Sequence, residues 1–184
     1  MSWEEELFGY LDDLEGHAAA LYDAERGPEI ADRGRAEYRS VTLAARLMAS
    51  VDLEVTLELS GVGPVSGRLA RVATGWCLLD GPGQEWVVRL DAVAVARGVS
   101  DRAVPELAWP AVARLSLAAA LRRLADSVEP CTVYLTDGGR YDGCVQRVGA
   151  DFVEVAAGET GRQVLVAFGR LAAVQSRHAL EPSG

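Results

Sequence analysis

The chain has 184 residues, of which 49% are hydrophobic, and its 27 acidic residues outnumber its 18 basic residues to give a net charge of −9. All the basic residues are arginine, which excludes every mechanism that needs a lysine, such as a P-loop phosphate site or a Schiff base. Two histidines, His17 and His178, are too few for a histidine-rich metal site. The three cysteines stand at no metal-ligand spacing, so we expect reduced thiols in a cytoplasm.

The first 50 residues carry the pattern of two helices. Apolar side chains recur at helical spacing with acidic residues on the other face, and residues 1–27 have a net charge of −7. The Gly27-Pro28 step interrupts this pattern, and a second helix is predicted over about 29–49. Residues 1–50 are therefore predicted to form a helical hairpin. The acidic start and the lack of a long uncharged apolar run predict a cytoplasmic chain without a signal peptide or membrane span.

Residues 51–98 are predicted to form a first small barrel of five strands. Apolar residues occupy every second position of 55–59, which is the pattern of a half-buried strand. A glycine-rich turn follows at 61–64. Gly67 then interrupts the next strand, at the point where a small barrel bends.

Residues 99–127 are predicted to be a linker followed by a helix. Pro105 and Pro110 punctuate the linker. Strong helix formers with apolar residues at helical spacing follow at 115–125, so this helix precedes the next group of strands.

Residues 128–177 are predicted to form a second five-stranded barrel that repeats the first at a shift of 76 to 78 positions. Gly67 lies on Gly143 in this alignment, and the Asp137-Gly138 step is a strong hairpin signal. The predicted fold class is thus mainly β with α. It consists of a helical hairpin, two small barrels each preceded by a helix, and a flexible tail at 178–184.

The second repeat carries the pattern Val133-x-Leu135-x-Asp137-Gly138, followed by Gly143-x-Val145 and Asp151-Phe152-Val153. This pattern resembles the first sequence motif of the Sm-like superfamily of SH3-like barrels, and the first repeat resembles a degraded version of it. The resemblance, with a composition typical of a GC-rich genome, implies a bacterial tandem Sm-like protein. The family's usual activity is RNA binding through an asparagine-bearing loop and a basic-glycine step. This chain has no asparagine and carries the reverse step Gly169-Arg170, so the resemblance implies the fold more than RNA binding.

Nucleic-acid binding remains an alternative because arginines recur in and after the linker helix. The candidate contacts for nucleic acid or an acidic partner are Arg114, Arg122, Arg123, Arg140, Arg147 and Tyr141. The acidic net charge disfavours this alternative, because an acidic chain repels a phosphate backbone.

The apolar segment with Val164, Val166 and Phe168 is the candidate self-association edge, because an open sheet edge pairs with another strand. Such edges predict either that the two barrels pair with each other or that two chains associate through them. No serine or cysteine has an evident base partner, so we expect no enzyme activity, cofactor, metal or small-molecule ligand. We therefore expect a non-enzymatic protein-binding or self-assembling module, whose partner is a second copy or another protein. The alternative is an Sm-like regulatory protein that binds RNA or DNA.

Overall fold

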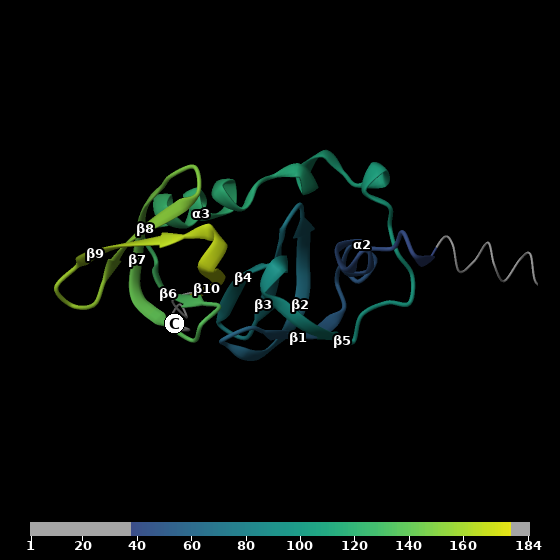
Figure 1. The fold of residues 1–184 in the computed structure, drawn as a ribbon, viewed down its shortest axis with the longest axis horizontal. Helices are drawn as coiled ribbons and strands as arrows, with labels where there is room; N and C mark the ends of the chain where they lie inside the picture. Colours follow the sequence, from purple (N-terminus) through teal and green to yellow (C-terminus); the bar gives the residue numbers. More distant parts are fainter. Residues whose placement is uncertain (1–37, 178–184) are drawn as a thin grey trace, which may run out of the picture. The chain divides into compact units, whose positions relative to one another are not determined.

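The computed structural model describes residues 38–177, in which ten strands form one antiparallel sheet (Figure 1). The chain divides into two units, Met1–Val41 and Thr42–Gly184, and the sheet lies in the second unit. The strands of the first half are β1 (Glu54–Leu59), β2 (Gly63–Ala73), β3 (Trp76–Gly81), β4 (Gln84–Arg89) and β5 (Val93–Arg97). The strands of the second half are β6 (Pro130–Leu135), β7 (Arg140–Val148), β8 (Phe152–Ala157), β9 (Arg162–Ala167) and β10 (Leu171–Arg177).

The prediction of two closed five-stranded barrels is wrong. The strands pair in the order β5-β1-β2-β3-β4-β10-β6-β7-β8-β9, so the described strands form a single open sheet with β5 and β9 at its edges. Apolar alternation predicts strands, but it carries no information about which edges pair. The pairing of β4 with β10 gives both strands a neighbour on each side, which satisfies backbone groups that an edge would leave free.

The helical hairpin predicted over residues 1–50 is also corrected. Residues 1–37 lie outside the described part, and in the described part the helix expected over 29–49 is replaced by the six-residue α2 (Leu43–Met48). The Thr42 hydroxyl caps α2 by accepting a hydrogen bond from the Ala45 backbone N–H at 3.1 Å, which begins the helix at this point. The predicted tail at 178–184 lies outside the described residues as well.

The linker that joins the two halves packs on the first half. It contains the short 3-10 turns η2 (Glu106–Ala108) and η3 (Ala111–Arg114), and it leads to α3 (Leu117–Ser127). Trp109 is buried, and its indole N–H donates to the Val104 carbonyl at 2.8 Å. The indole N–H of Trp76 on β3 donates to the Leu115 carbonyl at 2.7 Å, which anchors the start of α3 to the first half.

The two halves have the same strand pairing, position for position. The first half pairs as β5-β1-β2-β3-β4 and the second as β10-β6-β7-β8-β9. The register of β2 with β3 shifts between Leu69 and Arg71, and that of β7 with β8 shifts between Val145 and Arg147, which are the same positions at a spacing of 76. The turns η1 (Leu90–Ala92) and η4 (Phe168–Arg170) also correspond, since each links the last two strands of its half.

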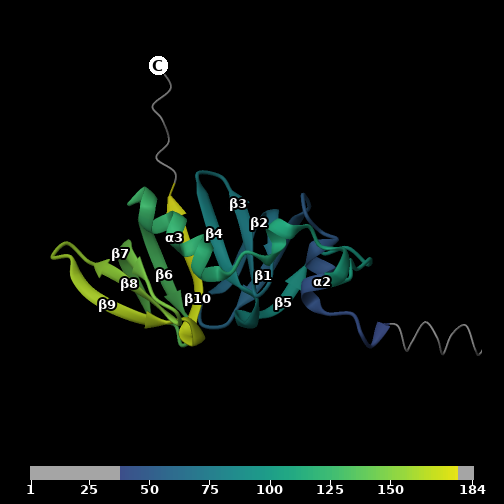
Figure 2. The ribbon, with the colours of Figure 1, turned by 90° about the horizontal axis from the view of Figure 1, so that it is seen from above.

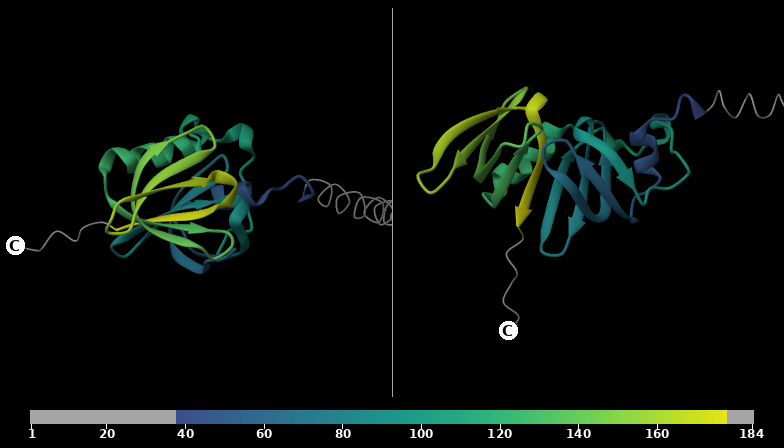
Figure 3. Two further views of the ribbon diagram at one scale, coloured as in Figure 1. Left: turned by 60° about the vertical axis from the view of Figure 1, so that its left-hand side comes forward. Right: turned by 60° about the horizontal axis from the view of Figure 1, so that its bottom comes forward.

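The apolar core crosses the boundary between the halves. One cluster of buried residues, centred on Leu57, Leu69 and Leu79, also contains Ala173 of β10. The other, centred on Val133 and Val153 with Leu121 of α3, also contains Trp76 and Val87 of the first half. Figure 2 shows β10 of the second half next to β4 of the first half, and Figure 3 shows the same ribbon from two further sides. Neither half therefore has a core made of its own residues alone.

Among the described residues, none of the helices has both the length and the apolar character that crossing a membrane requires.

Candidate functional site

The junction of the two halves, here called the seam, consists of β4, β10 and the side chains that cross between them. Its residue pairs are Ala173–Val88, Val174–Val87, Gln175–Trp86, Ser176–Glu85 and Arg177–Gln84. The four aliphatic residues of the first two pairs are all buried. The seam therefore joins the halves by backbone pairing and by a strip of apolar side chains from which water is excluded.

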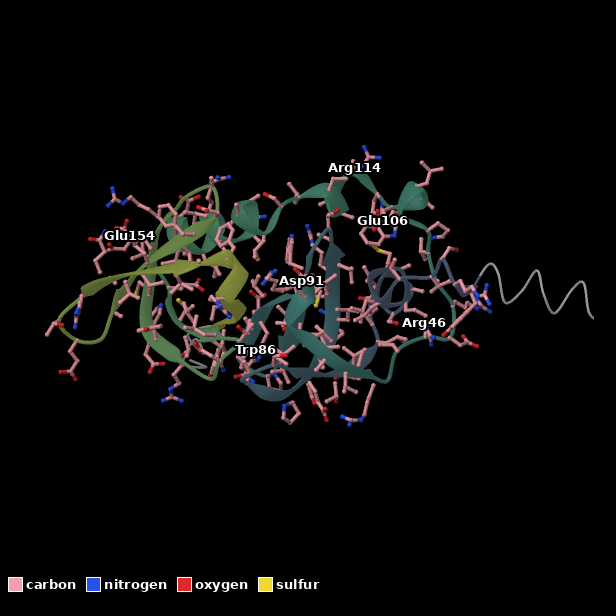
Figure 4. The ribbon with its side chains drawn as sticks, viewed as in Figure 1. Arg46, Trp86, Asp91, Glu106, Arg114 and Glu154 are labelled. Carbon is pink, nitrogen blue, oxygen red and sulfur yellow. The ribbon has the colours of Figure 1, made fainter. Side chains whose placement is uncertain are left out.

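An aromatic pair and a line of neutral polar groups complete the seam. The ring of Trp86 stacks on Tyr134 of β6 with centroids 5.3 Å apart and an interplanar angle of 28°. The Tyr134 hydroxyl donates to the Gln175 side-chain oxygen at 2.9 Å, and the Gln175 amide donates in turn to the Gln84 oxygen. The indole N–H of Trp86 is buried and has no hydrogen-bond partner in the described structure. Figure 4 shows Trp86 at the junction of the two halves.

Two turns also meet at the seam, one from each half. A Cβ atom on Gly61, in the turn after β1, would lie 2.5 Å from the backbone nitrogen of Gly138 and 2.6 Å from the carbonyl oxygen of Leu135. Gly61 also has a φ of +73°, a backbone conformation that residues with a side chain rarely adopt. A glycine is thus required where the first half touches the second.

The free edges β5 and β9 occupy the positions of the seam strands in the other half. At a spacing of 78, β9 corresponds to β4, and β5 corresponds to β10. Leu165 of β9 is 62% exposed, whereas its counterpart Val87 is 7% exposed at the seam. Val95 of β5 is 39% exposed, whereas its counterpart Ala173 is 0% exposed. The edges therefore present apolar side chains at the positions that the seam buries.

The residues predicted for a self-association edge lie on or beside β9. Val166 is a buried member of the second core cluster, and Val164, also a strand residue, packs partly buried against that cluster. Phe168 follows in η4 and packs partly against the same cluster. Leu165 between them is the exposed residue, and the sequence analysis missed it. The sequence has no clear signal for it, because 164–168 is apolar at every position and therefore shows no alternation between the two faces of the strand.

The residues predicted for nucleic-acid contact are spread over three elements. Arg114 lies in η3, Arg122 and Arg123 lie side by side on α3, and the others lie on β7, namely Arg140, Tyr141 and Arg147. Figure 4 shows Arg114 and Glu154, the partner of Arg147, in separate parts of the structure. The Tyr141 ring packs partly against the second core cluster. The arginines of the set are thus distributed over three elements, of which α3 and β7 pack against each other, and its one aromatic ring is partly taken up by core packing.

Two of the β7 arginines are next to carboxylates. Arg147 donates to Glu154 Oε1 from Nε at 3.2 Å and from Nη2 at 2.9 Å, and Arg140 lies 3.8 Å from Asp142. Glu154 is only 6% exposed, and the hydrogen bond from Arg147 is the main cause that lowers the pKa of its carboxyl group. The charges of these arginines are thus partly neutralised by a carboxylate of β7 itself and by one of the neighbouring strand β8.

A groove of about 620 Å³ lies between α3 and side chains of β2–β4. Its floor is mainly apolar, with Trp76, Leu78 and Val87 on the sheet side, and Arg71 and Arg123 also line it. No cluster of His, Cys, Asp or Glu within 38–177 is arranged to hold a metal ion.

Two of the three cysteines, Cys77 and Cys131, are buried. Burial raises the pKa of the Cys77 thiol to about 12 and that of Cys131 to about 11, so both thiols are protonated at neutral pH.

No protein-family model matches the sequence, and a search of curated proteins found no similar sequence. The Sm-like resemblance therefore stays a prediction drawn from the residues of the second repeat.

Proposed function

We propose that this chain is a non-enzymatic module that self-assembles by strand pairing between copies. In this proposal the two halves are copies of one repeat, and β9 of one molecule pairs with β5 of the next as β4 pairs with β10. The observation that carries the proposal is the difference in exposure at matched positions, 62% for Leu165 against 7% for Val87 and 39% for Val95 against 0% for Ala173. Edge strands with exposed aliphatic side chains favour association.

The seam supplies the register expected between copies. Shifting each seam pair by 78 positions gives Val95–Val166, Ala96–Leu165, Arg97–Val164, Gly98–Gln163 and Val99–Arg162. In this register Leu165 takes the place of Val87 and is covered by the neighbouring copy. The two contacting surfaces differ, so the association is head to tail and produces either a closed ring or an open filament.

We place the assembly in the cytoplasm because the three cysteines, Cys77, Cys131 and Cys144, are all free and suit a reducing compartment. Another protein with an exposed strand is the competing partner for the same edges. Nucleic acid is disfavoured because Arg140 and Arg147 each lie beside a carboxylate.

The test is the mass of the purified full chain by light scattering over a range of concentrations. The proposal expects a concentration-dependent oligomer, and Leu165→Asp is expected to weaken association by about tenfold or more because it places a charge in a strip that pairing buries. Val95→Asp on the opposite edge is expected to have the same effect. Leu107→Asp is the matched control, because Leu107 is 93% exposed in η2 and lies on neither edge.

Three results would overturn the proposal. They are a wild-type chain that stays monomeric at every concentration, association that Leu165→Asp leaves unchanged, and equal loss of association in the Leu107→Asp control. Thermal unfolding of each variant establishes that a loss of mass reflects association rather than misfolding, since Leu165, Val95 and Leu107 are all exposed.

A further inference from the structure

The polar groups of the seam and those of the free edges differ in charge at matched positions. At the seam, Tyr134, Gln175 and Gln84 form a neutral chain of hydrogen bonds across three strands. Their counterparts at spacings of 76 and 78 are Glu58 on β1, Arg97 on β5 and Arg162 on β9. Where the seam is neutral, the edges therefore carry one carboxylate and two guanidinium groups.

One ion pair of this set is already formed within the molecule. Arg97 Nη1 donates to Glu58 Oε1 at 2.7 Å, with side chains 59% and 37% exposed. The second carboxylate oxygen, Oε2, has no partner among the described residues. Arg162 is exposed at the start of β9 and forms no ion pair with any residue in 38–177. The acceptor thus lies on β1, next to the edge strand β5, and the unused donor lies on the opposite edge strand β9.

Resting on the self-association proposed above, we infer that Arg162 of one copy binds Glu58 of the next and completes an Arg97–Glu58–Arg162 bridge. In the seam, Gln84 of β4 reaches the Gln175 side chain next to Tyr134, so the same register brings Arg162 beside Arg97 and its bound carboxylate. Glu58 on β1 offers its second oxygen to the guanidinium of Arg162, which has to extend past Arg97 on β5, and the shared carboxylate offsets the repulsion between the two arginines.

This bridge makes the edge selective for a second copy of the same chain. Aliphatic side chains and backbone groups pair with almost any exposed strand. The Glu58 carboxylate and the Arg162 guanidinium, in contrast, stabilise only the strand register that brings them together. A strand with an acidic residue in place of Arg162 would meet Glu58 with like charge. Association should therefore weaken with salt, because partly exposed charges are screened.

The test compares charge variants of the full chain by sedimentation or light scattering, between about 50 and 500 mM salt. Arg162→Glu is expected to weaken association by about tenfold at low salt, and Arg162→Gln by less, with a smaller salt dependence in both. The triple variant Glu58→Arg, Arg97→Glu, Arg162→Glu reverses every charge of the bridge and is expected to restore association. Arg140→Glu is the matched control, because Arg140 is an exposed arginine on β7, away from both edges.

The outcomes separate this inference from the proposed function. If the wild-type chain does not associate, or if Leu165→Asp has no effect, the proposed function fails and the bridge fails with it. If Leu165→Asp abolishes association but Arg162→Glu behaves like Arg140→Glu, the bridge is overturned while self-association stands. The bridge is also overturned if the triple variant does not recover association. This holds when the triple variant and its three single substitutions all unfold at the wild-type temperature, so that misfolding is not the cause.

Discussion

The two halves of the sheet repeat the same strand pairing, yet their matched positions have different chemistry where one half is at the seam and the other is at an edge. Trp86 at the seam corresponds to Val164 on β9, and Tyr134 corresponds to Glu58 on β1. A stacked aromatic pair contributes about 0.5–1.5 kcal/mol beyond the area that it buries. An exposed carboxylate suits an edge that has to stay in water when it is unpaired.

This difference suggests how one strand geometry can serve two kinds of contact. The seam combines buried aliphatic residues, an aromatic stack and neutral hydrogen bonds, which together favour a contact that stays closed. The edges combine exposed aliphatic residues with charges and lack the aromatic stack, which favours a contact that opens with dilution or salt. Changing matched residues in the two halves can break or sharpen this comparison.

The largest difference is expected between Ala173→Asp and Val95→Asp, which place the same carboxylate at matched positions. Ala173 is fully buried at the seam, so Ala173→Asp is expected to lower the free energy of unfolding by about 3–5 kcal/mol. Val95 is 39% exposed at an edge, so Val95→Asp is expected to cost less than about 1 kcal/mol. Chemical denaturation of both variants measures the difference, and equal losses would contradict the assignment of seam and edge.

The position of strands was predictable from the sequence because burial alternates along them. The apolar residues of 55–59 predict a strand, and β1 occupies Glu54–Leu59 with Val55, Leu57 and Leu59 buried. The choice of sheet edges was not predictable, because the backbone groups that pair β4 with β10 are the same in every residue. Alternation therefore indicates which side chains face the core but not which strand lies next to which.

The candidate site was predictable only in part for a related reason. The segment from Val164 to Phe168 is apolar at every position, so the sequence identifies an apolar strand without showing which alternate residues face inward. The structure turns Val166 inward and leaves Leu165 62% exposed. The stack of Trp86 on Tyr134 joins residues far apart in the chain, and no local pattern predicts such a contact.

A smaller effect on the free energy of unfolding is expected when the pH is lowered. It arises at a position where the two halves carry different residues. Glu154 of β8 corresponds to Leu78 of β3, so an ion pair with Arg147 stands where the first half has an apolar residue facing α3. Arg147 lowers the pKa of Glu154 in the folded state. The pair therefore stabilises the fold above the pKa of an unfolded glutamate, and this stability is lost as the pH falls through the lowered folded pKa.

The measurement is the free energy of unfolding at about pH 7 and about pH 3 for the wild type and Glu154→Gln. Acid is expected to destabilise the wild type more than Glu154→Gln, because the variant has no carboxylate to protonate at this position. Glu159→Gln, in the exposed loop between β8 and β9, is the control and should follow the wild type. An equal response of the wild type and Glu154→Gln to acid would show that the pair adds nothing to stability.

The smallest effect is expected at Trp86, whose buried indole N–H has no hydrogen-bond partner in the described structure. A buried unpaired donor costs about 1–3 kcal/mol, and Trp86→Phe removes this cost while it keeps an aromatic ring against Tyr134. The smaller ring of phenylalanine leaves some space unfilled, which lowers stability. These opposing terms should leave the free energy of unfolding within about 1 kcal/mol of the wild type. Trp109→Phe is the matched control, because it removes the 2.8 Å hydrogen bond to the Val104 carbonyl and should lower stability by about 1–2 kcal/mol or more. The prediction would be contradicted if Trp86→Phe lowered the free energy of unfolding as much as Trp109→Phe does. That result would mean that the Trp86 indole N–H forms a hydrogen bond in solution.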